Sequence, residues 1–179
     1  MNWADSISAA IRETLEVLAE LAQHDPYREL VPNPGPPAGE QKIRRYEQHL
    51  GMRLPPSYRT FLAMHDGYEW LAFPGHMLSI EAVMPGGEYW DDIKEWKLGM
   101  AEAGLLEALD GIVVAYLDQP NNWVYLDPDR RQGEELELAL HVPGVDPDYF
   151  SDVAAFLHGS AARARLALSW ARQRDGGRG

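Results

Sequence analysis

Residues 43–67 most constrain the fold, because glycine and proline divide this stretch into two helices at defined positions. Apolar residues recur at helical spacing up to residue 50, and Gly51 suits the left-handed residue that ends a helix. Pro56 suits the first position of a second helix, because no partner is needed there for its missing N–H. The sequence therefore predicts a helical corner that ends at the Asp-Gly pair of residues 66–67.

Three segments in the second half of the chain are predicted to be strands. Residues 112–117 form a nearly continuous apolar run, which is typical of a strand buried on both faces. Residues 123–126 follow turn-forming residues, and a second turn is expected over residues 127–133. Residues 136–142 alternate apolar and polar side chains, as a half-buried strand does. The short connections favour an antiparallel meander.

Other segments are predicted from the same signals. Residues 2–22 carry one apolar stripe, which indicates a helix packed on the core of its own domain more than a partner-binding helix. Residues 68–73 are rich in aromatic residues and are expected to form a strand, and residues 88–98 are expected to form a helix. A last helix is predicted to start at Asp148 or Ser151.

The spacing of residues 43–67 is similar to the opening signature of the SMI1/KNR4 (SUKH) family. The matching positions are Ile43, Glu47, Leu50, Gly51, Leu54, Pro55, Tyr58, Phe61, Leu62, Asp66 and Gly67. The resemblance continues through the predicted strands and covers about residues 40–157. It implies an α+β domain that binds other proteins and performs no known chemistry. In bacteria, such domains resemble immunity proteins that neutralise polymorphic toxins.

We therefore expect a single α+β, SUKH-like domain, in which an antiparallel or mixed sheet packs against helices. An extra N-terminal helix and a long C-terminal helix complete it. The expected parts are an N-terminal helix (1–24), a proline- and glycine-rich linker (25–39), the SMI1/KNR4-like domain (40–158) and a C-terminal helical extension with a frayed basic tail (159–179). Five prolines and two glycines in the linker exclude the interior of a regular helix or strand.

The charge of the chain is negative and unevenly distributed. The net charge is −12, and residues 66–118 hold eleven acidic residues against two lysines. Such a surface repels nucleic acid and anionic membranes, and it attracts a basic protein partner. A solvated acidic face that only keeps the protein soluble is the other interpretation of the same bias.

The sequence offers no positive case for catalysis, a metal or a cofactor. It contains no cysteine, and none of its six histidines has metal-ligand spacing. Nucleophile-elbow, phosphate-loop and dinucleotide-binding motifs are absent. We therefore expect a non-enzymatic protein. No signal-peptide pattern or membrane-spanning run is seen in the sequence, so a cytoplasmic location is expected.

The function predicted from the resemblance and the charge is that of an immunity protein that binds a toxin through its acidic face, and a basic toxin domain is the partner that this charge favours. The alternative is a regulatory scaffold that binds several cellular proteins, which is what the resemblance to the fungal members of the family implies. An enzyme with an acidic active site is a third class. Acids for steering and tryptophans for anchoring give the contact candidates: Glu69, Trp70, Glu88, Trp90, Asp91, Asp92, Glu95 and Asp118.

Overall fold

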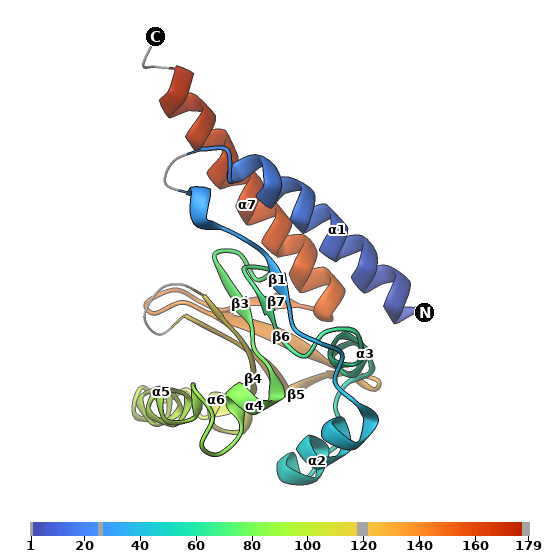
Figure 1. Ribbon diagram of the computed structural model, residues 1–179. Coiled ribbons are helices and arrows are strands. Elements are labelled where there is room, and N and C mark those ends of the chain that lie inside the picture. Colours follow the sequence, from blue (N-terminus) through green and yellow to red (C-terminus); the bar gives the residue numbers. More distant parts are fainter. Residues whose placement is uncertain (1, 25–26, 118–121, 177–179) are drawn as a thin grey trace.

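A computed structural model describes residues 2–24, 27–117 and 122–176 of the chain (Figure 1). Its strands form one seven-stranded sheet in chain order, and each strand pairs antiparallel with the next. The predicted α+β class is confirmed, and of the two expected sheet types the antiparallel one is found. The strands are β1 (Asn33–Pro34), β2 (Tyr68–Glu69), β3 (Gly75–Met77), β4 (Ile112–Leu117), β5 (Trp123–Gln132), β6 (Glu135–His141) and β7 (Asp148–Phe150).

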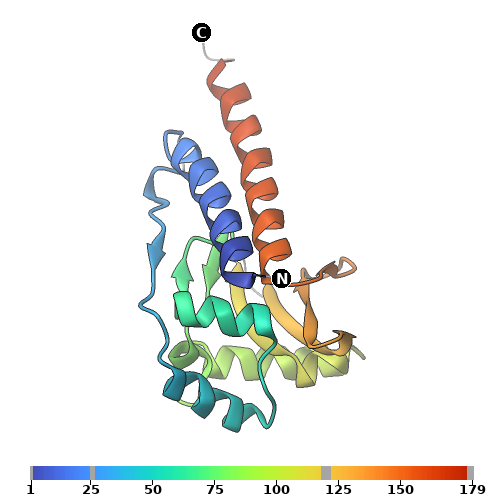
Figure 2. The ribbon, with the colours of Figure 1, turned by 90° about the vertical axis from the view of Figure 1, so that its right-hand side faces the viewer.

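The helices occupy both faces and one end of this sheet (Figures 1 and 2). The long helices α1 and α7 lie side by side over one face, and α5 crosses the other face. The helices are α1 (Trp3–Leu21), α2 (Glu40–Leu50), α3 (Pro56–Met64), α4 (Ile80–Val83), α5 (Trp90–Glu102), α6 (Glu107–Asp110) and α7 (Val153–Gly176), with a short 3-10 turn η1 at Tyr27–Glu29.

The predicted meander is confirmed as β4, β5 and β6, but β5 is longer than expected. It continues to Gln132 in place of the turn predicted after residue 126. The pairing of β5 with β6 shifts register between Leu126 and Arg131. An irregular stretch of this kind tolerates Pro128, which has no N–H to donate to a ladder. The chain reverses at Gly133, whose φ of 67° suits glycine.

Two expectations near the sheet edge were wrong. The strand predicted over residues 68–73 ends at Glu69, because Trp70 has a φ of 61° and its N–H bonds to Nδ1 of His76 at 3.1 Å. The proline-rich segment 25–39 was not expected to hold a strand, yet β1 forms there. β1 is only two residues long and lies at the edge of the sheet, where proline is tolerated.

Helices α1 and α7 run in the same direction and share a second, smaller core. Val17, Leu18 and Leu21 of α1 pack there with small α7 residues, including Ala164 and Ala171. The packing of α1 on the core of its own chain agrees with the interpretation of its apolar stripe.

Charge pairing follows the same interface. Arg165 of α7 bonds to Glu13 of α1 at 2.6 Å, and Arg172 pairs with Glu20. Part of the positive charge at the C-terminal end is therefore neutralised by α1.

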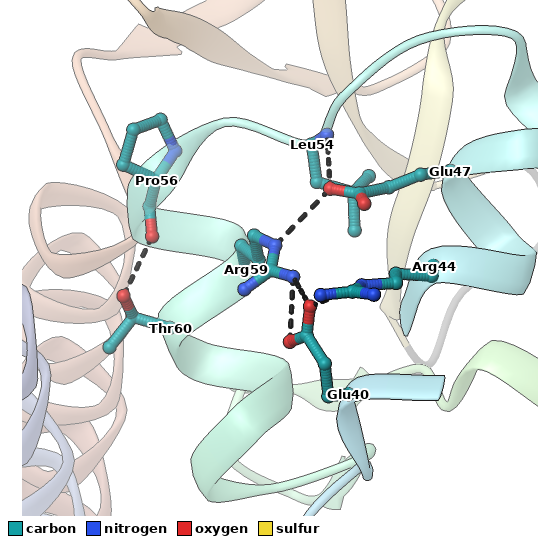
Figure 3. Close-up of polar contacts among 7 residues, drawn as sticks. All are labelled: Glu40, Arg44, Glu47, Leu54, Pro56, Arg59 and Thr60. Atoms are coloured by element: carbon teal, nitrogen blue, oxygen red, sulfur yellow. Dashed lines mark hydrogen bonds and ion pairs between the residues drawn. The ribbon is translucent and has the colours of Figure 1, made fainter. Parts of the chain in front are cut away.

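The α2–α3 corner is held by charged side chains (Figure 3). Arg59 of α3 donates from Nη2 to both carboxylate oxygens of Glu40, at 2.6 and 2.7 Å, and from Nε to Glu47 at 3.3 Å. Glu47 also accepts the backbone N–H of Leu54 at 3.1 Å. Arg44 reaches Glu40 as well, at 2.7 Å. Glu47 thus fixes the chain between the two helices, which gives this position of the family signature a structural role.

The Asp-Gly pair that ends the corner also has a structural role. Asp66 is buried, forms a 2.5 Å ion pair with Lys42 and accepts the backbone N–H of Ile80 at 2.8 Å. Gly67 has a φ of 87°, and a Cβ there would lie 3.0 Å from the backbone nitrogen of Ser79. This pair joins α2 to the start of α4.

The last helix starts later than predicted, at Val153. Asp148 belongs instead to strand β7, which pairs with β6. Asp152 accepts the backbone N–H of Ala155 at 2.9 Å and so caps the first turn of α7. The short edge strand β7 was not visible in the sequence, because its three residues carry no distinct pattern.

Candidate functional site

Helix α5 packs on the sheet through aromatic side chains. Trp96 lies 6.1 Å from Trp123 and 5.6 Å from Tyr125, between ring centroids, and 6.0 Å from the ring of His141. Trp123 pairs with His141 across β5 and β6, so both side chains point to the same face of the sheet. This face is the one opposite to α1 and α7 (Figure 1).

A groove of about 760 Å³ lies between α5 and the ends of strands β4, β5 and β6. Tyr89 and Tyr116 are half-buried at its surface, with ring centroids 5.7 Å apart. Trp96 and Trp123 are almost fully buried in its wall. The aromatic side chains give the groove an apolar floor.

Carboxylates form one side of the groove. Asp92, Glu95 and Glu102 line it, and they recur along one face of α5, with Gly99 between the last two. The side chains of all three acids are exposed to solvent. Within the described ranges, no ion pair is formed by these three side chains. Their negative charge is therefore available to a partner.

Three buried polar atoms in the groove wall have no hydrogen-bond partner in the described part of the chain. They are Nε1 of Trp96, Nε1 of Trp123 and Nδ1 of His141. Burial lowers the pKa of His141 below its usual value of 6.5. The imidazole is therefore mostly neutral at pH 7 and adds little positive charge to the wall.

The other large hollows on the described surface differ in charge. Lys42 and Arg45 line one of about 790 Å³ between α2 and α4, and several arginines line another of about 1150 Å³ at the α2–α3 corner. A smaller apolar one, between α1 and α3, includes Arg12. Among these four hollows, the α5 groove is the one without lysine or arginine in its described lining.

The structure brings some of the predicted contact residues together and separates others. Asp92 and Glu95 line the groove, and Asp91 is exposed nearby and pairs with Lys94 at 3.1 Å. Glu88 is exposed just before α5. Asp118 lies outside the described residues.

Glu69 is the last residue of β2, and Trp70 follows it in the turn between β2 and β3. That turn leads into residues that contact α7: the hydroxyl of Ser160 donates to the carbonyl oxygen of Leu71 at 2.8 Å. Trp70 is half-buried, and its ring lies 4.7 Å from that of His76. His76 pairs with Tyr116 across β3 and β4, so the Trp70 ring packs on the side of the sheet that carries the groove, but neither Glu69 nor Trp70 belongs to the described lining of the groove.

Trp90 begins α5 and is half-buried. Its ring packs edge-on against His49 of α2, at 6.0 Å between centroids, and Lys94 lies 5.7 Å from its centroid. These contacts pack Trp90 over the edge between α5 and α2, and its remaining exposed surface adjoins the acids of α5.

Sequence reasoning missed the sheet side of the groove, namely Tyr116, Trp123 and His141. The signal that could have found them is the alternation of side chains along a strand, which places Trp123 and Tyr125 on one face. The sequence prediction used charge and residue type, which directed it to α5.

Neither a metal site nor a membrane span is found in the ranges that the structure describes. No group of three or more histidine and acidic side chains is arranged to hold a metal ion there. Nor does any helix in these ranges combine the length and the apolar character that crossing a bilayer requires.

The model of the SMI1 / KNR4 family (SUKH-1) matches residues 37–156. The chain belongs to this family. The match contains the α2–α3 corner, the groove and strands β2 to β7, whereas α1 and most of α7 lie outside it. No match was found among curated proteins. The family resemblance seen in residues 43–67 is thus confirmed.

Proposed function

We propose that this SUKH-1 protein is a non-catalytic protein-binding module: an immunity protein that neutralises a polymorphic bacterial toxin by direct binding through the α5 face. The observation that supports the proposal is a set of three carboxylates, Asp92, Glu95 and Glu102, which form no ion pair among the described residues and lie beside an aromatic groove. Acids steer a basic partner toward the surface, and aromatic side chains supply contact area once it has docked. We expect the protein to act in the cytoplasm.

The experiment that tests this function is co-expression of the tagged chain with the products of its neighbouring genes, followed by affinity capture. Capture of one toxin domain, together with loss of that toxin's activity, would support the proposal. Capture of several housekeeping proteins without a toxin would contradict it and favour a regulatory scaffold. Turnover of a substrate by the purified chain would contradict the non-catalytic part.

Once a partner has been captured, a charge-reversal variant tests whether it binds through the α5 face. Asp91, Asp92 and Glu95 are replaced together by lysine, and association is measured at low salt. The association rate is expected to fall roughly 10- to 1000-fold, because attraction becomes repulsion. The matched control replaces three exposed acids elsewhere, Glu16, Glu29 and Glu134, by lysine. Equal rates in both variants would contradict the placement on α5.

A further inference from the structure

The groove beside α5 has the features of a receptor for one kind of side chain. Its surface combines two half-buried tyrosine rings, Tyr89 and Tyr116, with the carboxylates of Asp92, Glu95 and Glu102. Aromatic faces attract cations, and carboxylates pair with them. A negative, apolar hollow therefore matches a side chain that carries a positive charge on an apolar stem.

Arginine fits this combination better than lysine. Its guanidinium is planar, stacks on aromatic rings and pairs with carboxylates through two parallel hydrogen bonds. Its charge is also less strongly hydrated than that of an ammonium group, so less is lost when it enters a hollow. The groove contains two tyrosine rings and several carboxylates, so it offers both kinds of contact.

The groove wall behind the tyrosines contains two buried hydrogen-bond donors that bear on ligand binding. In the part of the chain that the structure describes, the indole N–H groups of Trp96 and Trp123 have no hydrogen-bond partner, although each side chain is more than nine-tenths buried. A buried donor without an acceptor is unfavourable, so an acceptor that reaches either group when the wall adjusts to a ligand would be stabilising. A peptide supplies such acceptors as backbone carbonyls next to its arginine.

We propose that the groove between α5 and strands β4–β6 receives an arginine side chain from an extended basic segment of the protein partner. This inference rests on the proposed function and adds the chemistry of the contact. The guanidinium lies against Tyr89 and Tyr116 and pairs with the carboxylates of α5. The aromatic rings hold the apolar stem.

The test is an NMR titration of the full chain, labelled with ¹⁵N, with the peptide acetyl-Gly-Arg-Gly-amide. The indole N–H signals of Trp96 and Trp123 report on the groove wall. Saturable shifts of these signals are expected. The same peptide with citrulline, a neutral group of similar shape, should bind about tenfold more weakly or worse, because it lacks the charge.

Two variants locate the site. Asp92→Asn, Glu95→Gln and Glu102→Gln together should weaken arginine-peptide binding about tenfold or more. The control variant, Glu16→Gln with Glu29→Gln and Glu134→Gln, has the same change in net charge and should bind as the unchanged protein does. The dispersion of each spectrum shows that the variant is folded.

Three results would overturn the inference: no saturable shift, equal binding of the citrulline peptide, or equal binding of a lysine peptide. Failure of the inference is separable from failure of the proposed function. If a captured toxin binds the groove variant with unchanged affinity, the proposed arginine site is contradicted and the immunity function is still supported. If the arginine peptide binds the groove but no toxin is captured, the arginine site is supported and the immunity function is not.

Discussion

Two acidic regions of this protein use the same residue types in opposite ways. In the α2–α3 corner, Glu40 and Glu47 are bound by arginines and by a backbone N–H (Figure 3). On α5, Asp92 and Glu95 have no ion-pair partner among the described residues and line a groove. The corner acids, of which Glu47 matches the family signature, thus stabilise the fold, whereas these two acids of α5 remain open to a partner.

The comparison predicts first that truncation destabilises the corner far more than the α5 face. Phe61 of α3 is fully buried, so Phe61→Ala should lower the free energy of unfolding by about 3–5 kcal/mol, through lost contacts and a cavity. Leu98 of α5 is 63% exposed, and Leu98→Ala should change the free energy of unfolding by less than about 0.5 kcal/mol. Urea denaturation measures both.

A large loss from Leu98→Ala would break the comparison, because it would show that the outer face of α5 is part of the stabilising core. A small loss from Phe61→Ala would show that the corner relaxes around the missing ring.

The second prediction concerns the acids themselves. Glu47→Ala should lower the free energy of unfolding by about 1–3 kcal/mol, because the N–H of Leu54 and one contact of Arg59 lose their acceptor. Glu95→Ala on α5 should leave stability within about 0.5 kcal/mol of the unchanged protein. Partner binding is expected to respond in the opposite order.

Thermal and urea denaturation of the two variants, with binding measured alongside, check this prediction. A stable Glu47→Ala protein that binds its partner poorly would reverse the assigned roles. So would a Glu95→Ala protein that unfolds easily.

The sequence predicted the corner and the meander well because their signals are local. Gly51 and Pro56 each restrict the backbone conformation at their own position. Residues 112–117 form a nearly continuous apolar run, which indicates a strand in the middle of a sheet with both faces buried. Strand β7 and the irregular part of β5 were missed, because they depend on pairing with β6, which no local pattern records.

The candidate site could be predicted only in part, for the same reason. Acidic residues of α5 are close in sequence, so their charge was visible. The groove also needs Tyr116 and Trp123, whose place beside α5 follows from tertiary packing. Glu69 and Trp70 were grouped with α5 by residue type, but neither belongs to the described lining of the groove.

A third prediction uses the neutral His141 in the groove wall. Burial lowers its pKa, so the unfolded chain takes up this proton at a higher pH than the folded chain does. Its contribution to stability is therefore complete above about pH 6.5 and decreases as the pH falls below that value. The variant His141→Gln, which cannot titrate, should lose less stability than the unchanged protein between pH 7.5 and about 5.5.

Urea midpoints at both pH values give the comparison, and the difference between the two proteins cancels the effect of the other histidines. An equal loss in both proteins would contradict the assignment of a buried, neutral His141. It would also remove the argument that this side of the groove carries no positive charge.

The smallest expected effect sharpens the account of the corner, where the charges are paired but one polar atom is not. The hydroxyl of Tyr58 is buried without a hydrogen-bond partner in the described structure, and burial raises its pKa well above 10.0. An unpaired buried hydroxyl is unfavourable, so Tyr58→Phe should leave the free energy of unfolding unchanged or raise it by up to about 1 kcal/mol. Urea denaturation measures the change. A loss greater than about 1 kcal/mol would mean that the hydroxyl is satisfied, for example by an internal water, and that the corner depends on a polar contact beyond its arginine–glutamate pairs.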